Sequence, residues 1–178
     1  MTCFYVLLVS SNIQAQVDIE QHDVFFTIPE ISIMDIEPDN TTIALTFDLP
    51  NEAGAPIGVS ANSTDNTKWI NYSSSISPTS SFKNISAQIT SGLVPDGVEL
   101  NLQAGIYGGI GQGVLGTPVG LITLNNTAQN IITGIGGAFT GDGINNGHQL
   151  TFSLSIDDYG LLDYDNSSTI EVTFTITD

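Results

Sequence analysis

Oxygen-bearing side chains concentrate in one stretch near the C-terminus, where residues 157–166 read DDYGLLDYDN. Calcium takes six to eight oxygen ligands and tolerates irregular loops, so this composition favours a calcium site. A second oxygen-rich loop, residues 141–146, would supply further ligands if it lies nearby. Neither loop has EF-hand spacing, and solvated Asp and Asn turns are the commoner use of such residues. The candidate calcium ligands are Asp142, Asp157, Asp158, Asp163 and Asp165.

Three other patterns suggest chemistry but lack its context. Residues 111–116, GQGVLG, match a dinucleotide-binding loop, yet the following Thr117-Pro118 does not open the required helix, so we interpret them as a flexible inter-strand loop. His22 and His148 lie in no hydrolase or zinc motif, and each is expected to be hydrogen-bonded or to face solvent. Nineteen acidic residues make paired carboxylates uninformative. The sequence therefore predicts no enzyme, no catalytic residue and no cofactor other than calcium.

The charge balance limits the partners. Nineteen acidic residues face only Lys68 and Lys83, for a formal net charge of -17. Such a surface repels phosphate backbones and anionic lipid headgroups. We therefore expect no nucleic-acid binding and no direct membrane insertion.

The first fifteen residues resemble the end of a secretory signal peptide. They contain no charge, an apolar run over residues 3–9 and small or polar residues up to Ala15, although a basic beginning is missing. The run is shorter than the roughly 20 residues that span a bilayer. Cys3, the single cysteine, lies in this segment, so the mature chain would hold no disulfide. We expect export to the extracellular space or the bacterial cell surface, with residues 16–178 forming one domain.

Alternation of apolar and polar residues predicts the elements that position these loops. Residues 169–177 place Ile170, Val172, Phe174 and Ile176 on one face, as in a half-buried strand. No segment has a helical period. We predict an all-β, immunoglobulin-like two-sheet antiparallel sandwich of about eight to ten strands. The expected strands are 24–28, 31–36, 43–47, 68–74, 82–90, 98–104, 119–124, 150–156 and 169–177.

One predicted strand carries aromatic residues beside an amide, a combination used in carbohydrate recognition. Alternation over residues 68–73 puts Trp69 with Asn71 on one face and Ile70 with Tyr72 on the other. At least one aromatic side chain must therefore point inward. We expect Trp69 to fill the core.

Several segments resemble a group of small secreted bacterial β-sandwich proteins. The similar segments are WINYSS at 69–74, ISAQITSG at 85–92, TAQNIITGIG at 127–136, TGDG at 140–143 and GHQL at 147–150. The layout is more distantly similar to fimbrial and spore-coat-U-like pilus subunits, with a glycine-rich middle and a strongly alternating C-terminal strand. The resemblance implies an extracellular sandwich and supplies no catalytic residues.

These observations favour a secreted, non-enzymatic structural or adhesive surface module. Assembly would proceed by edge-strand pairing, as in fimbriae, with copies of itself or other cell-surface proteins as partners. The donor would be residues 17–28, through Val24, Phe26 and Ile28, or the C-terminal residues 170–176. A simpler interpretation makes 24–28 the first strand of its own sandwich. The alternative function is a stand-alone extracellular domain that binds calcium or carbohydrate.

Overall fold

The computed structural model describes residues 18–163 and 168–177, so the predicted signal peptide lies outside the described residues. Within these ranges the chain is all-β, with two single-turn 3₁₀ helices. The strands are β1 (Ile31–Glu37), β2 (Thr64–Ser75), β3 (Lys83–Ser91), β4 (Val98–Gly108), β5 (Gln112–Pro118), β6 (Leu121–Thr123), β7 (Gln129–Phe139), β8 (Gly147–Ile156) and β9 (Glu171–Thr177); the helices are η1 (Ala61–Ser63) and η2 (Tyr159–Leu161).

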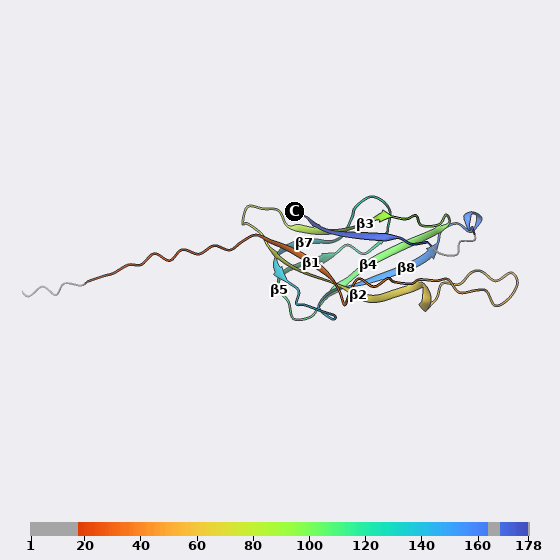
Figure 1. The fold of residues 1–178 in the computed structure, drawn as a ribbon, viewed down its shortest axis with the longest axis horizontal. Coiled ribbons are helices and arrows are strands. Elements are labelled where there is room, and N and C mark those ends of the chain that lie inside the picture. Colours follow the sequence, from red (N-terminus) through yellow and green to blue (C-terminus); the bar gives the residue numbers. More distant parts are fainter. Residues whose placement is uncertain (1–17, 164–167, 178) are drawn as a thin grey trace, which may run out of the picture.

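The strands form a β-sandwich-like antiparallel arrangement, which confirms the predicted fold class (Figure 1). Strand order is β6-β4-β8-β2-β7-β3-β9, with β1 beside β2 and β5 beside β7. β2 pairs with β8 through residues 64–70 and with β7 at Ser73 and Ser74. It therefore connects one layer, β6-β4-β8, to the other, β5-β7-β3-β9, while β1 pairs with residues 69–75 of β2.

The core lies between these layers and is almost entirely aliphatic. Alternation places Leu100, Leu102 and Ala104 of β4 inward, as predicted. β7 was not predicted, because Ile131, Ile132 and Ile135 are all fully buried and do not alternate. Its pairing with β3 shifts register twice over this stretch. Such bulges break the period of two on which the prediction depended.

The glycine-rich segment is a strand, and its interpretation as a flexible loop was wrong. Residues 112–118 form β5, which pairs with β7 from Gln112 to Pro118. Glycines at positions 111, 113 and 116 surround Val114 and Leu115. Because glycine has no side chain, the sequence shows no alternation of apolar and polar residues here. The segment therefore belongs to the folded sheet.

Trp69 does not fill the core, contrary to expectation. Ile70 and Tyr72 are buried between the layers, so alternation along β2 sends Trp69 to the outer face. There it is half-buried, with its ring beside Gly108. The expected strand 43–47 is also absent, although Ile43 and Leu45 still pack against the core.

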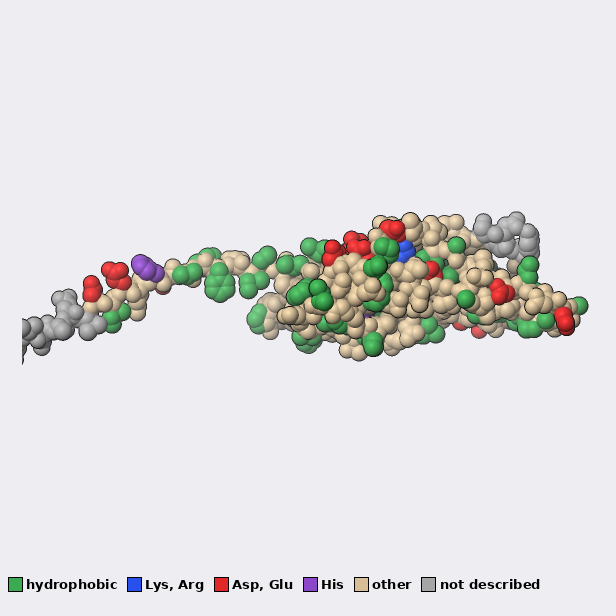
Figure 2. Space-filling model, turned by 90° about the horizontal axis from the view of Figure 1, so that it is seen from below, with side chains coloured by type: hydrophobic (Ala, Val, Ile, Leu, Met, Phe, Trp, Pro, Cys, Tyr) green, Lys and Arg blue, Asp and Glu red, His purple; other side chains and the backbone are tan. Residues whose placement is uncertain are grey.

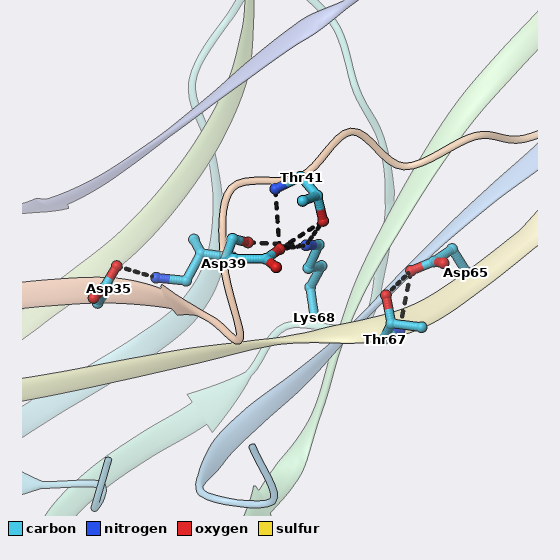
Figure 3. Close-up of polar contacts among 7 residues, drawn as sticks. Asp35, Asp39, Thr41, Asp65, Thr67 and Lys68 are labelled. Atoms are coloured by element: carbon cyan, nitrogen blue, oxygen red, sulfur yellow. Dashed lines mark hydrogen bonds and ion pairs between the residues drawn. The ribbon is translucent and has the colours of Figure 1, made fainter. Parts of the chain in front are cut away.

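A buried lysine ties the long β1–β2 connection to the sandwich (Figure 3). The Lys68 ammonium donates to the Asp39 carboxylate at 2.7 Å, to its carbonyl oxygen at 2.8 Å and to the Thr41 hydroxyl at 3.0 Å. Hydrogen bonds from Lys68 and from Thr41 hold the pKa of Asp39 well below its usual range. The contact satisfies a charge that would otherwise be costly to bury. Lys68 is therefore a structural residue.

Candidate assembly site

The residues before β1 extend away from the domain (Figure 1). Residues 18–30 are assigned to no strand, so the expected strand at 24–28 does not form within its own sandwich. Val24, Phe26 and Ile28 are 84%, 78% and 75% exposed. Figure 2 shows hydrophobic side chains along this extension, with acidic ones toward its outer part. Together with Phe25, which is 92% exposed, these residues make residues 24–28 a contiguous exposed apolar stretch.

The extension is fixed to the domain at one point. The Ser75 hydroxyl donates to the Pro29 carbonyl and accepts from the Ile31 amide, both at 2.7 Å. The buried Lys83 ammonium donates to the Glu30 carboxylate at 3.0 Å. Pro29 has no amide hydrogen to donate to a sheet ladder, so pairing along β1 does not continue into the extension.

The C-terminal candidate segment has a different place in the fold. β9 pairs with β3 from Glu171 to Thr177 and ends the strand order. Its inward residues Val172, Phe174 and Ile176, with Ile170 just before the strand, pack against the core but remain only partly buried. The segment is part of its own sheet, and one of its edges is unpaired among the described strands.

The predicted calcium ligands that the structure describes are not gathered at one place. Asp142 precedes β8 and Asp157 follows it, so this ten-residue strand separates them by roughly 30 Å. The Asp158 carboxylate caps η2 by accepting from the Gly160 amide at 2.8 Å, and Asp163 follows that turn. Asp165 lies outside the described residues. Across residues 18–163 and 168–177, no group of three or more His, Cys, Asp or Glu side chains is placed to hold a metal ion.

His148 is the most enclosed titratable group among the described residues, and the sequence did not reveal its surroundings. It is fully buried, stacks on Tyr72 at a ring-centroid distance of 6.0 Å and meets Tyr107 edge-on. Its Nδ1 lies 2.8 Å from the Gly105 carbonyl and its Nε2 lies 3.3 Å from the Leu115 carbonyl, and both of these oxygens can only accept. The expectation that both histidines are hydrogen-bonded or face solvent is confirmed, because His22 is exposed.

Burial lowers the pKa of His148 below its ordinary 6.5, against the opposing effect of the Gly105 and Leu115 carbonyls. The unfolded chain therefore binds a proton more readily than the folded one. We expect the free energy of unfolding to fall as the pH drops below about 6.5, a window in which most carboxylates stay ionised. Urea unfolding at pH 7.5, 6.5 and 5.5 measures this. The control variant His22→Gln should lose as much stability as the wild type over this pH range. A free energy of unfolding that stays constant or rises toward pH 5.5 would contradict the lowered pKa of His148.

The two aromatic residues of β2 lie in different environments. Tyr72 is 3% exposed, and its hydroxyl donates to the Leu115 carbonyl, so it is unavailable to a ligand. Trp69 is half-buried on the outer face. The two aromatics therefore form no common sugar-binding platform.

The domain presents no basic side chain to solvent. Lys68 and Lys83 are the only lysines and there is no arginine; their side chains are 7% and 4% exposed, and each pairs with a carboxylate. The face in Figure 2 accordingly shows very little blue. The charged side chains on the outer surface are therefore almost all acidic.

Comparison with known proteins finds no matching family, curated protein or solved structure. The resemblance to small secreted bacterial proteins and to pilus subunits stays a prediction. Among the described residues, no helix is long and apolar enough to cross a membrane.

Proposed function

We propose that this protein is an extracellular, non-enzymatic structural subunit that assembles with copies of itself by strand pairing. The extension, residues 18–30, is the donor. The observation that carries the proposal is the exposure of Val24, Phe26 and Ile28 on a segment that belongs to no strand of its own domain. An extended segment with alternating apolar side chains is suited to strand addition at a sheet edge.

Burial of apolar side chains supplies a driving force for such an addition. Burying Val24, Phe26 and Ile28 together contributes roughly 5–9 kcal/mol of hydrophobic free energy. Backbone hydrogen bonds to the acceptor strand add specificity, because one face of the donor points inward only in the correct register. Ordering the extension and losing the freedom of a separate molecule oppose this gain.

The partner is a second molecule because of how the extension leaves the domain. Contacts at Pro29, Glu30 and Ile31 fix its base, and upstream of them the chain runs outward from the sandwich (Figure 1). Donation to another copy leaves that copy's own extension available for a third. Head-to-tail contact between different surfaces produces an open series when the rotation does not close. The proposed product is therefore a filament or chain.

The test compares two neighbouring phenylalanines. Phe26 shares a face with Val24 and Ile28, whereas Phe25, 92% exposed, points to the opposite face of an extended strand. We expect the wild-type protein from the cell-surface fraction to give a ladder of bands on an unheated detergent gel and a monomer after boiling. Phe26→Asp should remove the ladder, and Phe25→Asp should retain most of it.

Two results would count against the proposal. A single monomer band for the wild type, heated or unheated, would exclude stable strand exchange. Equal loss in Phe25→Asp and Phe26→Asp would show that alternation along the extension is irrelevant. Far-ultraviolet circular dichroism of both variants should match the wild type, since neither side chain contacts the folded domain.

A further inference from the structure

We propose that the free edge of β9 is the acceptor, and that residues 24–28 of a second copy occupy it. This inference rests on the proposed function and specifies its docking surface. Both segments first appear as candidate donors, but the structure gives them opposite roles. The N-terminal segment is detached from every described strand, whereas β9 is already a sheet edge with one side open.

No described strand pairs with the edge of β9 away from β3, although β1 passes near this strand. Val172, Phe174 and Ile176 face the core but remain only partly buried, whereas Ile85 on the adjacent β3 is fully buried. An added strand would place its own inward row over this exposed margin. Val24, Phe26 and Ile28 form such a row of three, with the same spacing of two residues.

The other sheet edges are less suited to accepting a strand. β6 is three residues long. β5 contains Gly113 with a φ of +101° and ends at Pro118, features that distort and terminate an edge. β1 carries Asp35 and Glu37 and begins beside Glu30. β9 is regular over most of its pairing with β3, and its register shifts only at the Glu171 end.

Charge also favours this pairing. Each copy has a net charge of -17, so most contacts between copies place carboxylates together. Residues 24–28 read VFFTI and residues 172–177 read VTFTIT, and neither stretch contains a charged side chain. The donor and acceptor strips are therefore places where two copies can meet with little electrostatic repulsion.

Cysteine trapping tests the acceptor, because Cys3 lies in the predicted signal peptide and the mature chain would contain no competing thiol. Thr27→Cys labels the outward face of the donor, and Thr173→Cys or Thr175→Cys labels the outward face of β9. Opposed residues of neighbouring strands bring Cα atoms to about 4.5–5.5 Å, within disulfide range. Thr117→Cys on the exposed edge of β5 is the matched control.

Mixed donor and acceptor variants are oxidised with glutathione disulfide and run on a non-reducing gel. We expect a heterodimer band from Thr27→Cys with one of the β9 variants, at least tenfold stronger than with Thr117→Cys. A ladder on unheated gels together with preferential trapping at Thr117→Cys, or no preference, would overturn the β9 assignment and leave strand donation intact. If light scattering finds only monomers of the wild-type protein, the proposed function itself is wrong.

Discussion

Raising the salt concentration from about 0.01 M to about 0.15 M is expected to speed assembly by about tenfold or more. Both lysines are buried in ion pairs, so nearly all the charged side chains that approaching copies present to each other are acidic. The Debye length shortens from about 30 Å to about 8 Å over this range, which screens the repulsion. The uncharged donor and acceptor strips lose nothing by the same screening. Light scattering against time measures the rate.

Carboxylates on the extension provide the control for this salt effect. Asp18, Glu20 and Asp23 precede the apolar part of the donor and must approach the acceptor copy with it. The triple variant Asp18→Asn, Glu20→Gln, Asp23→Asn should assemble faster than the wild type at low salt and gain less from added salt. Assembly that slows as salt rises would contradict the account, because it would require attraction between opposite charges at the contact.

Substituting Gly113 by Ala is expected to destabilise the domain far more than the same change at Gly120. Both glycines have a left-handed φ, +101° and +112°. A Cβ at Gly113 would lie 2.1 Å from the Gly137 carbonyl oxygen, whereas a Cβ at Gly120 meets nothing within 4 Å. Gly120→Ala should cost about 1–3 kcal/mol for the backbone conformation alone, and Gly113→Ala roughly 2–6 kcal/mol once overpacking is included.

Urea unfolding of the two variants measures this difference directly. The comparison holds the substitution and the sign of φ constant, so the remaining variable is the close approach of β5 to β7. Equal losses of stability would mean that residues 112–118 are not held against β7. That outcome would restore the interpretation of this segment as a flexible loop.

Strict alternation explains which strands the sequence predicts. β8, β9 and residues 98–104 of β4 place every second residue on the core, as at Leu150 and Phe152, so their inward faces are visible in the sequence. β7 hides its face because its register shifts against its neighbours, and β5 because glycine carries no side chain to pattern. Bulges and glycine-rich strands defeat a period-of-two prediction for physical reasons.

The sequence predicts the candidate site only in part. It identifies Val24, Phe26 and Ile28 as an alternating set, but a strand of the same domain and a detached donor have the same pattern. Contacts distant in sequence, those of Glu30 with Lys83 and of Pro29 with Ser75, hold the base of the segment at the edge of the domain, and no local pattern reveals them. Likewise, no local pattern shows that Asp142 and Asp157 are too far apart to share a calcium ion. The length of β8, which lies between them, sets this distance.

The most direct test of strand donation removes the donor without touching the sandwich. A mature chain that begins at Pro29 keeps the Ser75 and Lys83 contacts and should retain the wild-type unfolding midpoint. Multi-angle light scattering after size exclusion, at about 0.15 M salt to screen repulsion, then compares the two chains. We predict a series of multimers for the wild type and a monomer for the shortened chain. A wild-type monomer, or multimers that persist without residues 16–28, would contradict strand donation by the extension.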